Sequence, residues 1–311
     1  SMHNKIRNMH TLKKMTSKLV LMNDIDYSEL SPLFCDNLDL IPYNELKTML
    51  ENTSYSRKDL FFYPQQGLRI SASLGLLKSM VYFKNNGAND FNGAIKHAAR
   101  NGHIDAVRLL INYGANSFNE PLYDASYCGY IEIVKLLIMN GANDFNGAIK
   151  HAARKGYLDI VKYLLESGAN LLEYPSTYAA KGGYIDVLRL LIEYGARDAV
   201  LNNALSEAAS IGRIDIMNLC IDNGANDFNE ALFEAASSGR IDIMNFCIDK
   251  GANNFNRALE YVGEFLYFHK PSNTSIVIEI IKILIEHGAD VTSIYFGRLL
   301  YHAAGGGYTD I

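Results

Sequence analysis

The chain is poor in the features on which several protein classes depend. It has no tryptophan, only 6 prolines and only 4 cysteines among 311 residues. No apolar run approaches the roughly 18 residues that span a bilayer, and no secretory signal is visible at the start. Positive charge is not in excess, since the formal net charge is −5. A nucleic acid is therefore not expected as the main partner, because phosphate binding needs a basic surface.

A repeat of 27 residues is the main feature that the chain does have. The tripeptide Gly-Ala-Asn recurs at this spacing, and Gly195 and Gly288 begin close variants of it. In seven units a second glycine precedes the first by 12 residues. The tripeptide begins at Gly87, Gly114, Gly141, Gly168, Gly224 and Gly251. A fixed period indicates a solenoid, whose units bury their apolar faces only against neighbours. Solenoids offer long surfaces, so the pattern favours a binding protein.

One unit, residues 87–113, shows how a repeat should fold. Its apolar residues follow helical spacing and predict helices over about 93–100 and about 104–112. Alanines on the first helix let neighbouring helices approach closely. We place its N-cap at Asn92, whose side-chain oxygen can accept an orphan backbone N–H. Gly102 supplies the left-handed conformation that ends the first helix, and Gly114 ends the second. Each unit is therefore predicted to be an antiparallel pair of short helices.

Counting the turn glycines predicts about eight full units and a truncated ninth. The regular units cover about 61–250, the longer eighth covers 251–287, and the ninth covers 288–311. The ninth stops before its second helix, so we expect a piece of a longer array, because terminal repeats normally need polar caps. The insertion in the eighth unit follows Tyr267 and Phe268 and is either a contact element or a neutral loop.

Residues 1–60 match no repeat and precede the array, which occupies 61–311. Helix-like stretches around 11–22 and 44–51 predict an N-terminal helical cap or a small separate domain. Residues 38–46 are also faintly similar to the start of an F-box, the ubiquitin-ligase adaptor motif.

The repeat unit resembles the ankyrin repeat. The family's Gly-His turn, Leu-Leu pair and Gly-Ala-Asp turn are matched by Gly102-His103, Leu109-Leu110 and Gly114-Ala115-Asn116. Residues 120–125 match its first-helix motif in part. The resemblance covers about 61–311 and implies an all-α solenoid that binds another protein. It implies no catalytic residue and no cofactor.

Two departures from the family pattern affect what the resemblance implies. The first-helix threonine and histidine of the family are missing, so its local hydrogen bonding does not carry over. The period is 27 rather than about 33 residues, so we expect no β-hairpin fingers between repeats and a binding surface made by first helices. The Asn- and Tyr-rich, finger-less form is similar to ankyrin proteins of giant, mimivirus-type DNA viruses.

The resemblance also implies which residues line the concave groove of the array. They are the first-helix residue before the Ala-Ala pair, the two residues after that pair, and nearby charged positions. In this chain they are Lys96, His97, Arg100, Tyr123, Asp124, Tyr127, Lys150, His151, Arg154, Lys155, Tyr178, Lys181, Glu207, Glu230 and Glu234. The groove would be basic with tyrosines from about 96 to 181 and acidic from about 203 to 238. Such poles orient a partner.

Two other observations leave the groove interpretation open. Variable solvated residues can fall anywhere on a repeat surface without serving a ligand. Residues 90–100 and 144–154 are also identical, as are 212–218 and 239–245. Copies this close indicate recent duplication, so some groove residues are inherited rather than selected.

The sequence shows no arrangement that predicts catalysis or metal binding. His97 and His151 are equivalent residues two repeats apart, which is about 20 Å and too far for a shared metal. Cys220 and Cys247 replace a buried leucine in neighbouring repeats and lie too far apart for a disulfide. We predict no catalytic, metal or cofactor-binding residue, and a monomer in a reducing, intracellular, cytoplasmic setting. If the viral resemblance holds, that setting is the host cytoplasm.

We therefore predict a non-catalytic scaffold that binds a partner protein through its first helices. One alternative is a ubiquitin-ligase adaptor that uses residues 1–60. Another is a substrate of an asparagine hydroxylase, because ankyrin asparagines after the Gly-Ala-Asp turn are hydroxylated in similar Asp-x-Asn contexts. The positions that match are Asn92, Asn146 and Asn229.

Overall fold

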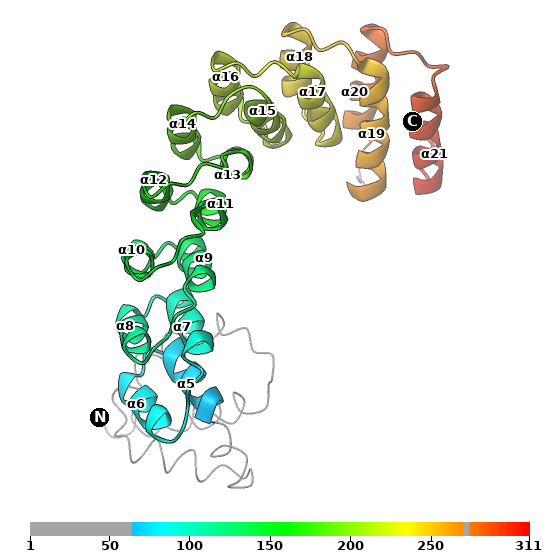
Figure 1. Ribbon diagram of the computed structural model, residues 1–311. Coiled ribbons are helices and arrows are strands. Elements are labelled where there is room, and N and C mark those ends of the chain that lie inside the picture. The colour runs from blue at the N-terminus through cyan, green and yellow to red at the C-terminus, as the bar shows by residue number, and fades with distance from the viewer. Residues whose placement is uncertain (1–63, 270–273) are drawn as a thin grey trace, which may run out of the picture. The chain divides into compact units, whose positions relative to one another are not determined.

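The computed structural model describes residues 64–269 and 274–311 (Figure 1). In these residues it contains seventeen α-helices and no strand, so the predicted all-α fold is confirmed. The chain divides into two compact units, one ending at Asp144 and one formed by Phe145–Ile311. Residues 1–60, with the predicted cap and the F-box-like stretch, lie outside the described residues.

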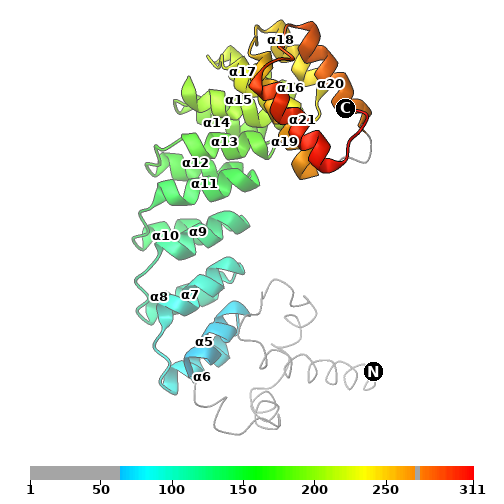
Figure 2. The same ribbon diagram turned by 90° about the vertical axis from the view of Figure 1, so that its right-hand side faces the viewer.

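The described part of the unit that ends at Asp144 contains three helix pairs (Figure 2). In each pair the two helices pack against each other, and each first helix also packs against the first helix of the next repeat. The pairs are α5 Pro64–Ser73 with α6 Leu77–Asn85, α7 Phe91–Arg100 with α8 Ile104–Asn112, and α9 Asn119–Cys128 with α10 Ile131–Met139.

The unit Phe145–Ile311 contains five helix pairs and a single first helix at its end. In Figure 1 its first helices lie on the inner side of a curved stack, and α12, α14 and α16 lie on the outer side. The pairs are α11 Phe145–Lys155 with α12 Leu158–Glu166, α13 Glu173–Lys181 with α14 Ile185–Glu193, α15 Ala199–Ile211 with α16 Ile214–Asp222, α17 Phe228–Ser237 with α18 Ile241–Asp249, and α19 Phe255–His269 with α20 Ser275–Glu286; α21 is Ile294–Gly306.

Small side chains on the first helices produce the close stacking. Ala94, Ala98 and Ala99 of α7 are fully buried together with Ile95. An alanine face allows two helix backbones to approach, whereas the larger apolar residues of the second helices hold those helices apart. First helices of neighbouring repeats therefore pack along their lengths, and neighbouring second helices touch at few positions.

Glycine ends the helices as predicted. Gly102 follows α7 with φ +81°, and Gly114 follows α8 with φ +102°. After α8, the Gly114 amide donates to Ile111 O at 2.9 Å and the Ala115 amide donates to Leu110 O at 3.0 Å. Both bonds satisfy carbonyls at the helix end that would otherwise have no partner.

The predicted N-cap at Asn92 is wrong. Helix α7 begins at Phe91, two residues earlier than predicted, because the Asp90 carboxylate accepts the Gly93 amide at 2.9 Å. Asp227 caps α17 in the same way by accepting the Glu230 amide. Asn92 therefore lies inside the helix, where it is available for another contact.

The longer eighth repeat has longer helices than most of the others. Its first helix, α19, has 15 residues and its second helix, α20, has 12, against 9 to 11 in most others. Tyr267 and Phe268 lie in the last turns of α19, and their side chains are outside the described residues, as is the loop 270–273. None of the described helices combines the length and apolar character that a membrane crossing needs.

Candidate functional site

In most of the described first helices, an asparagine bonds to the turn of the following repeat. Asn92 Oδ1 accepts the backbone amides of Asn116 at 2.9 Å and Ser117 at 3.1 Å. Asn92 Nδ2 donates to Asn116 Oδ1 at 3.0 Å. The same acceptor role falls to Asn119, Asn146, Asn202 and Asn229. We call this series the asparagine ladder.

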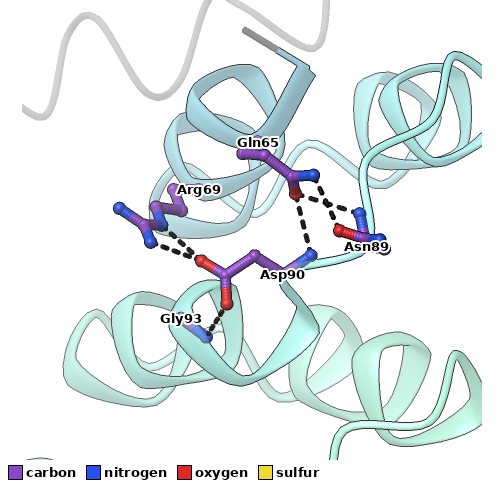
Figure 3. Close-up of polar contacts among 5 residues, drawn as sticks. All are labelled: Gln65, Arg69, Asn89, Asp90 and Gly93. Carbon is purple, nitrogen blue, oxygen red and sulfur yellow. Dashed lines mark hydrogen bonds and ion pairs between the residues drawn. The ribbon is translucent and has the colours of Figure 1, made fainter.

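In the first described repeat a glutamine takes the place of the asparagine (Figure 3). Gln65 Oε1 of α5 accepts the amides of Asn89 at 2.9 Å and Asp90 at 2.8 Å. The Asp90 carboxylate lies between Arg69 of α5 and the Gly93 amide of α7. Partial burial disfavours the ionised form, but the Gly93 amide and Arg69 outweigh it and lower the pKa of Asp90.

A second set of contacts links three of the described second helices, α8, α16 and α18, to the preceding repeat. The residue that follows the turn glycine reaches a carbonyl at the end of the previous first helix. Arg213 Nη1 donates to Gly183 O at 3.0 Å, and Arg240 Nε donates to Ser210 O at 3.0 Å. His103 Nε2 lies 3.0 Å from Ser73 O in the same arrangement. Together with the asparagine ladder, these bonds connect neighbouring repeats.

In the unit that ends at Asp144, the predicted surface residues lie on α7 and α9 and face carboxylates. Lys96 Nζ lies 2.8 Å from Glu120 Oε2 of α9. This hydrogen bond raises the pKa of Lys96 and lowers that of Glu120. Burial raises the pKa of Asp124, although the charges of Lys96 and Arg100 act to lower it. The cations of α7 are therefore balanced by the acids of α9.

Two further predicted residues of this unit are partly buried. Burial lowers the pKa of His97, and Arg69, Lys96 and Arg100 act in the same direction. Tyr123 donates a hydrogen bond to the Asp144 carboxylate, and burial together with this bond raises its pKa to about 12. Both side chains are held in place and face charged neighbours.

In the unit Phe145–Ile311, the predicted basic residues of α11 face tyrosine. The guanidinium carbon of Arg154 lies 5.7 Å from the centre of the Tyr178 ring. A shallow hollow of about 340 Å³ is lined by Arg154, Tyr178, Lys181 and Gly182. Burial lowers the pKa of His151, and Lys150 and Arg154 add to this effect. The predicted residues of α11 and α13 thus come together on one face.

One residue of the predicted acidic stretch is paired with a lysine of the preceding repeat. Glu207 Oε2 lies 3.1 Å from Lys181 Nζ, so this carboxylate is paired within the array. Glu230 and Glu234 lie on α17, half-buried. Phe233 lies on the same helix and contacts Arg257 of α19. The guanidinium carbon of Arg257 lies 5.2 Å from the centre of the Phe233 ring. The acidic stretch therefore also carries an aromatic–arginine contact that the sequence did not predict.

Several partners of the surface residues were missed at the level of sequence. Glu120, Asp144 and Arg69 each pair with a residue of a neighbouring repeat. Their signal is spacing: Lys96 to Glu120 is 24 residues, and both Arg69 to Asp90 and Tyr123 to Asp144 are 21. A search at nearly one repeat length, rather than within one helix, would have found them.

The three asparagines proposed for hydroxylation belong to the asparagine ladder. The side-chain amides of Asn92, Asn146 and Asn229 each bond to the next repeat through both oxygen and nitrogen. A modifying enzyme would have to open these bonds to reach an extended asparagine segment. Hydroxylation of these residues stays a prediction.

The described residues hold no group of three or more His, Cys, Asp or Glu side chains that could bind a metal ion. Cys220 and Cys247 are buried thiols outside any disulfide, as predicted, and Cys128 is partly exposed.

The repeat geometry and the sequence comparison define the family together. The family model "Ankyrin repeats (3 copies)" matches residues 68–148 and again 149–229, just over half of the chain. The chain belongs to the ankyrin repeat family. A comparison with curated proteins found no match. Ankyrin repeats are generally non-catalytic protein–protein interaction modules, and the family match indicates no enzyme family.

Proposed function

We propose that this protein binds a partner protein through the exposed side of its first helices. The observation that carries the proposal is a difference between the two sides of those helices. The buried side repeats the same alanines, such as Ala98, Ala152 and Ala235. The residue before the buried pair varies in charge and size, as His97, Asp124, His151, Tyr178, Glu207 and Glu234.

This contrast fits recognition better than structural support. Packing between repeats is already satisfied by the alanine faces and the asparagine ladder, so the variable side chains are not needed for stacking. Tyrosine and arginine, which are frequent on this surface, are residues that contribute most at protein interfaces. The second helices carry mainly solvated charges such as Arg108 and Arg189, both exposed.

The test is affinity purification from lysate of cells in which the protein occurs, followed by mass spectrometry. The first-helix variant changes Lys96, Arg100, Lys150 and Arg154 to glutamate. A matched control changes Arg108, Lys135, Lys162 and Arg189 of the second helices to glutamate, which alters the net charge equally. We expect a partner that is recovered by the native chain and the control but reduced at least fivefold with the first-helix variant.

Circular dichroism and thermal melting of both variants show whether the array is intact. A partner recovered equally by the native chain and the first-helix variant, but lost with the control, would place binding on the second helices and contradict the proposal. Failure of all three to recover any protein above a bead control would also contradict it.

A further inference from the structure

Two first helices of this protein have the same sequence but different surroundings. Residues 91–100 of α7 and 145–154 of α11 both read Phe-Asn-Gly-Ala-Ile-Lys-His-Ala-Ala-Arg. Each presents one lysine and one arginine on its outer side, Lys96 with Arg100 and Lys150 with Arg154. Any difference between the two sites therefore comes from the neighbouring helices.

The following helix α9 supplies two carboxylates beside α7. Glu120 pairs with Lys96, and Asp124 lies within the field of Lys96 and Arg100. In α13 the equivalent positions, 54 residues further along the sequence, are Tyr174 and Tyr178. Both acids are thus replaced by tyrosine beside α11.

The cations of α11 therefore lack the carboxylates that neutralise their counterparts. Among the residues that the structure describes, neither Lys150 nor Arg154 forms an ion pair, and Arg154 lies over the Tyr178 ring instead. Glu173 of α13, which precedes Tyr174 in the sequence, accepts the Asn203 side chain at 3.5 Å. Lys181 is paired with Glu207. Two cations remain available to a ligand on this face.

Large apolar side chains are exposed beside these cations. Tyr174 is 62% exposed and Leu171 is 63% exposed. Position 171 corresponds to Asp90 and Asp144, whose carboxylates bond to Arg69 and Tyr123 in the other unit. A third acidic position is thus replaced by an apolar residue at the same place in the array. Exposed apolar residues grouped with unpaired cations are characteristic of an interface.

We propose that Lys150, Arg154, Leu171, Tyr174 and Tyr178, the α11–α13 surface, bind an acidic segment of the partner protein that also carries an apolar side chain. Carboxylates of the segment replace the missing Glu120 and Asp124 beside the two cations. The apolar side chain packs on Leu171 and Tyr174, and the hollow at Tyr178 and Lys181 receives the neighbouring part of the segment. This inference rests on the proposed function and names its partner class.

A peptide suits this surface better than a nucleic acid. The described residues supply only two unpaired cations here, and the next repeats continue with Glu207 and Glu230 rather than a basic stripe. Nucleic acids need several phosphate contacts to bind at physiological salt. A short acidic peptide needs one or two charge-assisted contacts together with apolar burial.

The test selects random twelve-residue peptides displayed on phage against the full chain. A synthetic peptide from the enriched pool is then measured by fluorescence anisotropy against the native chain, K150E/R154E and K96E/R100E. The last two variants carry the same substitutions in identical helices. We expect an enriched pool with at least twice the input content of Asp and Glu. The synthetic peptide should bind K150E/R154E at least tenfold more weakly and K96E/R100E less than threefold more weakly.

A further variant and an oligonucleotide control separate the possible outcomes. The variant K150Q/R154Q removes the two positive charges without adding negative ones, and its thermal melt is recorded as a check on folding. This variant should also weaken binding. Selected peptides without acidic excess, equal loss with both glutamate variants, no enrichment, or stronger binding of a twelve-residue oligo(dT) than of any peptide would each overturn the inference. If lysate recovers a partner that depends on other first-helix residues, the proposed function stands and only the partner class fails.

Discussion

At the scale of single residues, the asparagine ladder has a measurable effect on stability. Replacing Asn92 by alanine removes the acceptor of two backbone amides in the next repeat. A net hydrogen bond contributes about 0.5–1.5 kcal/mol, while alanine regains roughly 0.5 kcal/mol of helix propensity. We expect Asn92→Ala to lower the free energy of unfolding by about 1 kcal/mol, measured by urea denaturation.

Asn112 provides the matched control for this change. It is the exposed last residue of α8 and makes no side-chain hydrogen bond among the described residues. Asn112→Ala should leave the stability unchanged or raise it slightly. Equal stability losses in the two variants would show that the ladder bonds do not stabilise the stack.

Two histidines give the stability a pH dependence. Burial and neighbouring cations lower the pKa of His97 and His151 below the usual value of 6.5. Below about pH 6.5 the unfolded chain therefore binds protons that the folded chain does not. The free energy of unfolding should be constant above this pH and should fall as the pH drops from 6.5 toward the lowered folded pKa.

The double variant H97Q/H151Q tests this dependence by urea denaturation between pH 7.5 and 5.5. Glutamine does not titrate, so the decline should become shallower than in the native chain. An unchanged slope would mean that these two histidines are not the source.

At the scale of helices, glycine conformation decides the effect of an added methyl group. Gly288 follows α20 with φ +104°, and a Cβ there would meet nothing within 4 Å. Gly297 lies inside α21, where a Cβ also meets nothing within 4 Å. Gly288→Ala should destabilise by about 1–2 kcal/mol because of the left-handed backbone. Gly297→Ala should stabilise by about 0.5–1 kcal/mol because alanine favours a helix.

Chemical denaturation of the two variants side by side measures this difference. They lie in the same repeat, so the surrounding stack is the same for both. Shifts of the same sign would contradict the assignment of one glycine to the helix end and the other to the helix interior.

At the scale of the whole molecule, buried thiols report how the repeats open. Cys220 of α16 and Cys247 of α18 are fully buried, and burial raises the pKa of each to about 12. Partly exposed Cys128 should react with iodoacetamide faster by about two orders of magnitude. Because repeats are stabilised by their neighbours, Cys220 and Cys247 should become reactive together, within about threefold, as urea rises.

Peptide mapping by mass spectrometry separates these sites. Rapid labelling of one buried cysteine in native buffer while the other stays protected would show that adjacent repeats open independently. That result would contradict the coupling expected from the stacked first helices.

The array as a whole was largely predictable from the sequence, and its surface was not. The glycine period fixes where helices end, because Gly102 and Gly114 need the left-handed conformation wherever they occur. Asn92 was misassigned because capping is a local rule, whereas its bonding partners lie 24 and 25 residues away. The identity of α7 and α11 likewise concealed that Lys96 is paired and Lys150 is not. The viral resemblance, the adaptor role of residues 1–60 and the cytoplasmic location stay predictions.

The asparagine ladder has a consequence for how such an array can change. Its donors are main-chain amides, so the residue at the second donor position can vary freely. That residue is Ser117, Asp144, Leu171, Asp227 or Asn254 after the five asparagines of the ladder. A copied repeat inserted after any of these five asparagines would find its bonding partner already in place, whatever side chain it carried at the second donor position. Repeats are therefore interchangeable modules, and a new binding specificity can arise by copying a unit and altering only its outward residues.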